Sequence, residues 1–507
     1  MVERRRQKDY RTFKFTRASV NKMKKLNFVF VLTDDQSYWA LQRETPCIIS
    51  PTLDKISSEG AYFKNFFCAC PVCSPARASI LTGLMPSTHG VQDWLSSGNV
   101  DFDKMPKYVQ ERAPIKQNET VKIDFLEEFE TYTDVLADNG YNIALSGKWH
   151  LGDTLKTRKG YVYWNSILRG GCSYFSYDMA HKGEITPHTE YLTDLITDNA
   201  IEFIDGYNDE KPFYLAVHYT APHTPWDRSE HKEELWNLYS DADYSCVPNE
   251  KIHKDQIVHK YIGDTDEKRR EWLTGYFASI TGVDQSLQKI IDALNAKGIL
   301  DDTVIIFTGD NGNNLGQHGV WGKGNGTYPQ NMYEESIKVP FMMYNKKIIK
   351  PQEVTQLCSH VDIFPTILDL AGIEFNPSEN MWGESLLKVT NNQVERNHVV
   401  VYDEYGAVRM VRNERYKFIK NYKTNEETFF DLEVDKTETT NVVGIKKYAE
   451  IVDSMRAEME ADFEKYTVKN SDARVFNNKG AGQKSKVDIS SNAEAFIQDL
   501  TMYYEKK

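Results

Sequence analysis

The stretch FVFVLTDD, residues 28–35, decides the fold of this 507-residue chain. Five consecutive apolar residues with no polar alternation are typical of a strand buried on both faces, as in a parallel sheet covered by helices. Three more segments have the same character, at residues 142–146, 213–218 and 304–308. The sequence therefore predicts four central parallel strands.

Helices are expected between these strands, because start and stop residues bracket the intervening segments. We expect helices at residues 51–59, 131–139, 191–204 and 269–297, ended by Gly60, Gly140, Gly206 and Gly298. Alternating strands and helices predict a layered α/β domain with helices on both faces of the sheet. After Gly372, four short apolar segments around an Asn413-Glu414 turn predict an antiparallel meander, at residues 399–402, 407–412, 416–420 and 428–432.

The expected organisation is a basic N-terminal extension (1–22), a catalytic domain (23–375) and a smaller C-terminal subdomain (376–507). A polar stretch around residues 470–490 predicts a surface loop. A net charge of −13 disfavours a protein that holds nucleic acid along a basic surface, so any bound anion must be met locally. The sequence contains no apolar run of about 18 residues, so no membrane span is expected.

Seven cysteines at irregular spacing give no disulfide framework, which fits a reducing compartment. The N-terminal residues lack the apolar core of a signal peptide. Together these features predict a cytoplasmic protein.

Polar side chains follow each of the four predicted strands. Ligands of open α/β sheets bind beyond the carboxyl ends of the strands, so these side chains are expected to converge. They are Asp34, Asp35, Lys148, His150, His218, His223, Asp310 and Asn311. Three carboxylates and a carboxamide form an oxygen-rich site that suits calcium rather than zinc. Lysines and histidines around such a cation suit an anionic substrate that bridges to it.

A second feature is the segment Cys73-Ser74-Pro75-Ala76-Arg77. Proline is favoured in a first helical turn, so a helix is expected to begin at Pro75. Cys73 would lie at the positive end of that helix, and Arg77, about one turn on, would point at the same anion. The neighbouring Cys68 and Cys70 leave zinc binding as an alternative, although no second pair at finger spacing follows.

These residues resemble the ordered motifs of the formylglycine-dependent sulfatases. Besides the 73–77 segment, the resemblance rests on residues 34–36, 147–152, 222–225, 309–312 and 322–324, with further similarity at 334–340 and 361–366. Residues 315–319 and 321–327 are most similar to bacterial carbohydrate sulfatases. The resemblance implies an alkaline-phosphatase-like fold, a large mixed sheet flanked by helices with a small C-terminal antiparallel sheet.

The resemblance also implies roles for individual residues. Cys73 would be converted to formylglycine, and Ca²⁺ would be held by Asp34, Asp35, Asp310, Asn311 and the oxidised side chain of residue 73. His150 would accept a proton when sulfate is released, and His223 would protonate the departing sugar oxygen. Lys148, Lys323 and Arg77 would neutralise charge on the sulfate and the nucleophile. His318 and Trp321 are candidates for contacting the substrate.

The leading hypothesis is an exo-acting sulfatase for a small sulfated sugar, with galactose or N-acetylgalactosamine as the first choice. Its expected partners are that sugar and a formylglycine-generating maturation enzyme. One alternative is a phosphate mono- or diesterase, or a phosphonate ester hydrolase, of the same superfamily. A second is a binding protein for sulfated glycans that never matures Cys73.

Overall fold

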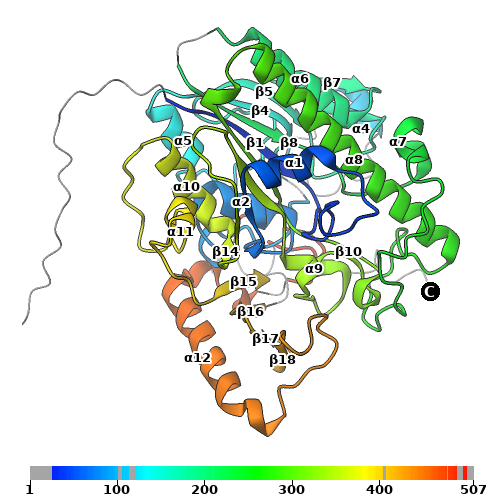
Figure 1. Ribbon diagram of the computed structural model, residues 1–507, viewed down its shortest axis with the longest axis vertical. Coiled ribbons are helices and arrows are strands. Elements are labelled where there is room, and N and C mark those ends of the chain that lie inside the picture. Colours follow the sequence, from blue (N-terminus) through cyan, green and yellow to red (C-terminus); the bar gives the residue numbers. More distant parts are fainter. Residues whose placement is uncertain are drawn as a thin grey trace, which may run out of the picture.

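A computed structural model describes residues 25–96, 98–100, 105–112, 122–208, 211–403, 407–476, 478–487 and 495–498. Its centre is a mixed sheet of ten strands (Figure 1). In spatial order the strands are β13 (Gln352–Val354), β2 (Ala61–Phe63), β12 (Phe341–Tyr344), β9 (Thr303–Gly309), β1 (Asn27–Thr33), β8 (Phe213–His218), β4 (Asn142–Lys148), β5 (Tyr161–Ile167), β6 (Tyr177–His181) and β7 (Glu184–His188). The predicted N-terminal extension, 1–22, lies outside the described residues.

The four predicted parallel strands are confirmed, and they are neighbours in the order β9, β1, β8 and β4. Leu32 of β1 pairs with His218 of β8 on one side and Thr308 of β9 on the other, and Gly147 of β4 also pairs with His218. This register ends the four strands at nearly the same level. The polar residues that follow them therefore start from one edge of the sheet.

Side chains of β1 alternate between two cores, as the pleat of a strand requires. Phe28, Phe30 and Leu32 pack in one core with residues of α2 (Cys73–Thr82), α5 (Tyr132–Asp138) and α10 (Ile363–Leu370). Val29 and Val31 pack in the other with residues of α1 (Pro51–Glu59), α6 (Leu192–Gly206) and α8 (Asp266–Ala296). The sheet is therefore covered by helices on both faces, as predicted.

The helix boundaries differ from the predictions by more than one residue in three places. Helix α2 begins at Cys73, two residues before the predicted start, so Pro75 lies inside the first turn, where its missing N–H is not needed. Helix α6 runs through Gly206 instead of ending before it. Helix α8 begins earlier than predicted because the hydroxyl of Thr265 accepts from the Lys268 N–H and caps it.

The C-terminal meander is confirmed as a four-stranded antiparallel sheet below the main domain in Figure 1. Its strands are β15 (Val399–Asp403), β16 (Val408–Arg412), β17 (Tyr416–Asn421) and β18 (Glu426–Asp431), and α12 (Ala449–Tyr466) packs against it. The remaining helices and paired strands are short: β3 (Phe66–Phe67), α3 (Pro86–His89), α4 (Lys107–Arg112), α7 (Glu233–Asn237), β10 (Asn314–Leu315), β11 (Trp321–Gly322), α9 (Glu334–Ile337), β14 (Cys358–Ser359) and α11 (Leu386–Thr390).

Two further expectations are corrected by the structure. Cys47 and Cys246 form a disulfide across 199 residues of sequence, so the prediction of no disulfides is wrong. The cysteines therefore no longer support a reducing compartment. Spacing along the chain could not reveal a pair made only by folding. The 470–490 stretch is also not simply a surface loop, because Asn478, Ala481 and Gln483 are buried. Among the described helices, none combines the length and apolar character that a membrane crossing requires.

Candidate active site

The acidic residues that follow β1 and β9 meet beyond the strand ends. The backbone N–H of Asp35 donates to Oδ1 of Asp310 at 3.2 Å, and the amide of Asn311 donates to Oδ1 of Asp35 at 2.8 Å. All three side chains are buried, as is Asp34. Asp35 has a φ of 64°, a sparsely populated conformation that in folded proteins is concentrated at functional sites.

Three cations neutralise these carboxylates around Cys73. Lys323 donates through Nζ to Oδ1 of Asp35 at 2.6 Å and to Sγ of Cys73 at 3.0 Å. Lys148 donates to Asp34, and Nε of Arg77 donates to Oδ2 of Asp310 at 2.9 Å. Each carboxylate thus has one cationic partner. The structure brings the predicted nucleophile, acidic residues and cations into one cluster.

The pKa values reflect this pairing. Burial alone would raise the pKa of Asp34, but the charges of Lys148 and His223 outweigh it and hold the pKa below the ordinary value. Burial would also raise the pKa of Asp35, but the charges of Lys323 and His223 outweigh burial and lower that pKa below its ordinary value. For Asp310, burial and the charge of Asp34 raise the pKa despite Arg77. Burial also raises the pKa of the Cys73 thiol.

The donor set fits a hard divalent cation. Oδ1 of Asp34 and Oδ1 of Asn311 are buried and have no hydrogen-bond partner among the described residues. An unpartnered buried oxygen is costly unless an ion or water satisfies it. Ligand atoms of Asp34, Asp35 and Cys73 lie within 4.8 Å of one another, close enough to share one ion. Carboxylate and amide oxygens are the ligands that calcium prefers.

His150 lies deep in the site, with 4% of its surface exposed and a φ of 56°. Its Nε2 lies 3.0 Å from the carbonyl oxygen of Leu95, and because a carbonyl only accepts, Nε2 carries the proton. Nδ1 is then a lone-pair acceptor, and it is buried with no partner in the described parts of the chain. Burial and the charge of Lys148 hold the pKa of His150 well below its ordinary value, so the ring is neutral.

His223 lies nearer the surface, with 23% of its side chain exposed. Its Nδ1 donates to the carbonyl of Thr224 at 2.7 Å, which leaves Nε2 facing Oδ2 of Asp35 at 3.9 Å. The two histidines therefore present different nitrogens at different depths. His218, by contrast, donates through Nδ1 to the Lys148 carbonyl at 3.1 Å and is buried, as a core histidine would be.

Three residues near this cluster were not identified from the sequence. Leu95 supplies the carbonyl that fixes the His150 ring, and Gly170 lies so close that a Cβ there would be 2.2 Å from Cε1 of His150. The next residue, Gly171, lies beside His223. The Gly170-Gly171 pair just after β5 was an available sequence signal. The carbonyl of Leu95 has no side-chain signature at all.

The two predicted substrate contacts have other surroundings. Trp321 is 1% exposed and packs in the core against Gly263, surroundings typical of a core residue, and its substrate role stays a prediction. His318 stacks on Tyr333 with ring centroids 3.8 Å apart, and its Nε2 lies 2.9 Å from Glu335. The role of His318 stays a prediction.

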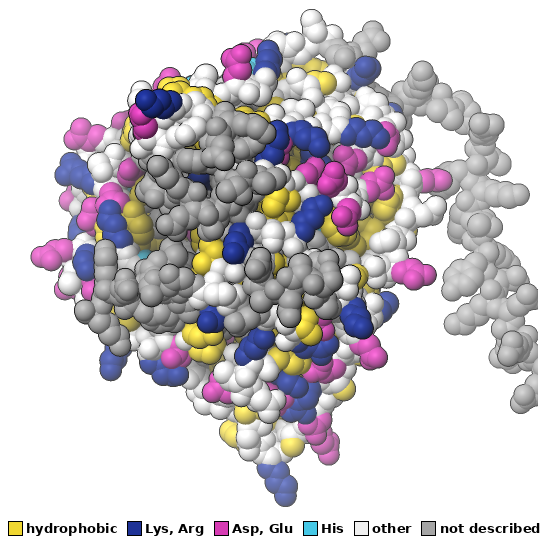
Figure 2. Space-filling model, turned by 180° about the vertical axis from the view of Figure 1, so that it is seen from behind, with side chains coloured by type: hydrophobic (Ala, Val, Ile, Leu, Met, Phe, Trp, Pro, Cys, Tyr) yellow, Lys and Arg dark blue, Asp and Glu magenta, His cyan; other side chains and the backbone are white. Residues whose placement is uncertain are grey.

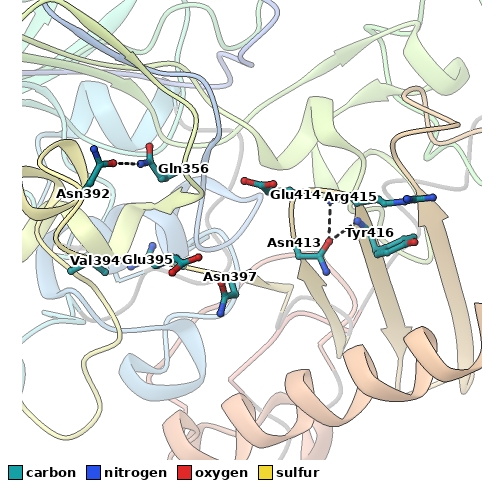
Figure 3. Close-up of a pocket in the computed structure, with 10 residues that line it drawn as sticks. Gln356, Asn392, Val394, Glu395, Asn397, Asn413, Glu414, Arg415 and Tyr416 are labelled. Atoms are coloured by element: carbon teal, nitrogen blue, oxygen red, sulfur yellow. Dashed lines mark hydrogen bonds between the residues drawn. The ribbon is translucent and has the colours of Figure 1, made fainter.

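A polar hollow of about 610 Å³ lies between the loop after α11 and the turn from β16 to β17 (Figure 3). Figure 3 shows the side chains of Glu395, Asn397 and Glu414 around it. None of the described residues that line it belongs to the cluster around Cys73. This hollow is therefore separate from the cluster around Cys73.

Comparisons with known proteins agree with this geometry. The chain matches the family described as Sulfatase over residues 26–373, and the N-sulphoglucosamine sulphohydrolase C-terminal family over residues 316–465. The N-acetylglucosamine-6-O-sulfatase of Bacteroides thetaiotaomicron is 27% identical, with 84% of each chain covered. The choline-sulfatase of Rhizobium meliloti is also 27% identical, over 78% of this chain and 77% of its own.

A solved structure of a protein in complex with its substrate, D-glucosamine-2-N,6-O-disulfate, aligns with a TM-score of 0.72 at 24% identity. The alignment covers 89% of this chain and 99% of the other. The alkaline-phosphatase-like fold is thereby confirmed. Fold and site define a hydrolase of sulfuric esters. The chain belongs to the sulfatase family.

Proposed function

We propose that this sulfatase hydrolyses a sulfate ester on a small sugar of the glucosamine class, using formylglycine at position 73 and a calcium ion. The observation that carries the proposal is the cluster of three carboxylates, one carboxamide and three cations around Cys73. Two of the three relatives described above, the N-acetylglucosamine-6-O-sulfatase and the protein solved with D-glucosamine-2-N,6-O-disulfate, support the sugar class, and none of the three supports galactose or N-acetylgalactosamine.

Cys73 is the position at which the nucleophile would be made. As the first residue of α2, it lies at a helix N-terminus, where the dipole favours an anion. Oxidation to formylglycine would supply a hydrated aldehyde, with one hydroxyl to attack sulfur and a second whose proton loss lets sulfate leave. Lys323 contacts the residue 73 side chain directly and stabilises negative charge there.

Calcium would be held by Asp34, Asp35, Asp310 and Asn311. When bound, it would polarise an oxygen of the sulfate and so favour attack at sulfur. Within the cluster, the formal charges of the three carboxylates and the three cations cancel. A divalent ion would therefore leave the site with a local positive charge, although the whole protein carries −13. Arg77 and Lys148 would share the equatorial sulfate oxygens.

The depths of the two histidines divide the acid and base roles. His150 is buried and neutral, with its Nδ1 lone pair unused, which suits removal of a proton from the buried nucleophile side. His223 is partly exposed, on the side from which a sugar would enter and leave, and its Nε2 is not bonded to a backbone group. As an imidazolium, with Nδ1 bonded to the Thr224 carbonyl and a second proton on Nε2, it would suit protonation of the departing sugar oxygen.

A small substrate fits the charge distribution better than a polymer. On the face shown in Figure 2, basic and acidic side chains are interspersed wherever the surface is described, and no continuous basic track is seen. A long sulfated chain would therefore meet acidic groups on that face outside the site. This favours exo action on a terminal or free sugar.

The test is a panel of sulfated sugars assayed with matured enzyme and calcium. We expect release of sulfate from glucosamine and N-acetylglucosamine sulfates at rates at least tenfold above those for galactose and N-acetylgalactosamine sulfates. Intact sulfated polymers should be turned over more slowly than their terminal fragments. Preference for galactose would refute the sugar class, and faster turnover of polymer would refute exo action.

Two controls address the chemistry. Nitrophenyl phosphate and phosphonate esters should be poorer substrates than nitrophenyl sulfate, and the reverse ranking would favour the phosphoesterase alternative. Intact mass spectrometry after co-expression with a formylglycine-generating enzyme should show the Cys73 thiol converted to an aldehyde. An unmodified thiol in fully active enzyme would contradict the proposed nucleophile.

A further inference from the structure

A segment near the C-terminus returns to the catalytic domain after α12. We call residues 478–487 the return segment. It packs against residues 90–96, about 390 positions earlier in sequence, and Leu95 and Gln483 form a parallel β-bridge. The return segment lies beyond the residues matched by either family description. Its buried residues are not explained by the C-terminal sheet, which they do not join.

Gln483 is the centre of this contact and is fully buried. Its side-chain oxygen accepts from the Gln92 N–H at 2.8 Å, and its side-chain amide donates to the Gly90 carbonyl at 3.0 Å. Its backbone N–H donates to the Trp94 carbonyl at 2.8 Å, and its carbonyl accepts from the Ser96 N–H at 3.0 Å. One residue thus satisfies backbone groups along the whole of residues 90–96.

The same short segment holds the catalytic helix and His150. The N–H of Leu95 donates to Oγ of Ser74, the neighbour of Cys73, at 3.1 Å. The Leu95 carbonyl accepts from Nε2 of His150 at 3.0 Å. Backbone bonds of Gln483 flank Leu95 on both sides, at Trp94 and Ser96. Gln483 is therefore two contacts away from the histidine ring and never touches it.

We propose that Gln483 is a positioning residue, which holds the Leu95 carbonyl so that His150 keeps its proton on Nε2 and its lone pair on Nδ1. The inference rests on the proposed role of His150 as the base that lets sulfate leave. A base must be oriented and held in the correct tautomer by a third group. Here that group is a backbone carbonyl, and a residue from the far end of the chain fixes its place.

The experiment replaces Gln483 by methionine, which keeps length and volume but removes all three side-chain hydrogen bonds, those to Gln92 and Gly90 and the one to the Ser485 carbonyl at 2.9 Å. We expect kcat to fall about 10- to 100-fold while KM changes less than about threefold. Because the second half of the reaction would be slowed, a sulfated form of the enzyme should accumulate in intact mass spectra. The pH dependence of kcat in Gln483→Met should also differ from that of the wild type. Gln498→Met, in the same C-terminal region, is the matched control and should match the wild type.

A milder variant covers the case in which Gln483→Met does not fold. Ser96→Ala removes only the hydroxyl bond to the Gln483 carbonyl, at 3.1 Å, and leaves the backbone bonds. It should lower kcat by about two- to fivefold, with the same accumulation of sulfated enzyme. A rise in KM with unchanged kcat in either folded variant would overturn the positioning role.

A double variant separates this inference from the proposed function. If Gln483 acts through His150, Gln483→Met should add no further loss in a His150→Ala background. Additive losses would overturn the inference. If His150→Ala itself accumulates no sulfated enzyme, the proposed base is wrong. If it does accumulate and Gln483→Met does not, only the positioning role fails.

Discussion

Gly170 is the residue at which one added methyl group would disturb the site most directly. A Cβ there would lie 2.2 Å from Cε1 and 2.4 Å from Nε2 of His150, the atom bonded to the Leu95 carbonyl. Contacts that short force the ring or the loop to move. We therefore expect Gly170→Ala to lower kcat about 10- to 100-fold, since a displacement of about 1 Å has effects of that size.

The measurement is steady-state kinetics together with thermal unfolding. Gly206→Ala is the matched control, because a Cβ at Gly206 would have no atom within 4 Å among the described residues. It should be as active as the wild type. Wild-type kcat in Gly170→Ala would show that the His150 ring position is not critical.

Asp310 connects the cation site to Arg77, so its loss has two consequences. Asp310→Ala removes a carboxylate from the calcium donor set and leaves the 2% exposed Arg77 without its ion-pair partner. An unpaired buried charge destabilises a protein by about 3–5 kcal/mol. We expect loss of bound calcium, loss of activity and a lower melting temperature. Elemental analysis by mass spectrometry would measure the calcium.

Asp310→Asn separates the two effects, because it keeps the side-chain shape and a hydrogen-bond acceptor for Arg77. It should retain more stability than Asp310→Ala and still bind calcium more weakly than the wild type. Stoichiometric calcium in both variants would exclude Asp310 from the cation site.

At the scale of elements, a buried ion network joins the C-terminal sheet to α9. Lys417 of β17 is fully buried and donates to Glu334 of α9 at 2.9 Å and to the Met332 carbonyl at 2.9 Å. It also pairs with Glu438, and Arg412 of β16 bonds Glu334 at 3.1 Å. Burial would raise the pKa of Glu334, but Arg412 and Lys417 hold it well below its ordinary value.

Lys417→Met should therefore destabilise the contact between the C-terminal sheet and α9. It removes the cation that Glu334 and Glu438 share inside the protein, and we expect a loss of about 3–5 kcal/mol in the free energy of unfolding. Lys420→Met is the control, because Lys420 is partly exposed and pairs with Glu460 at 3.4 Å, which is worth about 0–1 kcal/mol. Equal losses in urea titrations would contradict a specific role for the network.

The elements that the sequence predicted are those whose signal is local. The strands β1, β4, β8 and β9 each contain an uninterrupted apolar run of three to five residues, and Thr131 and Ser50 mark helix starts directly. The strands β2, β12 and β13 are three or four residues long and depend on neighbours far along the chain for their pairing. Such pairing has no local signature. The order of the ten strands could not be derived for that reason.

At the scale of the whole molecule, the site residues also fall into two groups, those that the sequence predicted and those that only the tertiary structure revealed. Asp34, Asp35, Asp310 and Asn311 were predicted because strand ends converge in any parallel sheet. Leu95, Gly170 and Gln483 act through backbone position and close approach, which only the tertiary structure defines. The Cys47–Cys246 disulfide belongs to the same group.

Buried histidines make the stability of the whole molecule depend on pH. Burial lowers the pKa of His89 and His218 to about 3, and of His231 and His360 to about 4. In the unfolded chain each would titrate near about 6.5, so between roughly pH 6 and pH 4.5 the unfolded state binds more protons. Stability is therefore present above the unfolded pKa and is lost as pH falls. His318 and His398 have raised pKa values, so their contribution to stability is present below the unfolded pKa and is lost as pH rises above it. Their effect therefore lies above the window from roughly pH 6 to pH 4.5.

Each of the four histidines should lower the free energy of unfolding by up to about 1.4 kcal/mol between pH 6 and pH 5, and Asp284, whose pKa burial raises to about 6, should offset part of that fall. Urea titrations at several pH values would measure the slope. His231→Phe should reduce this slope by the equivalent of about one bound proton. The variant is suitable because neither ring nitrogen of His231 has a hydrogen-bond partner in the described regions, and the ring contact with Tyr174 can be kept. Trp236→Phe, beside the same ring, changes packing without removing a titrating group and should leave the slope unchanged. A slope that is unchanged in His231→Phe would show that this histidine is already protonated in the folded protein near pH 5, so that its burial does not exclude the charge.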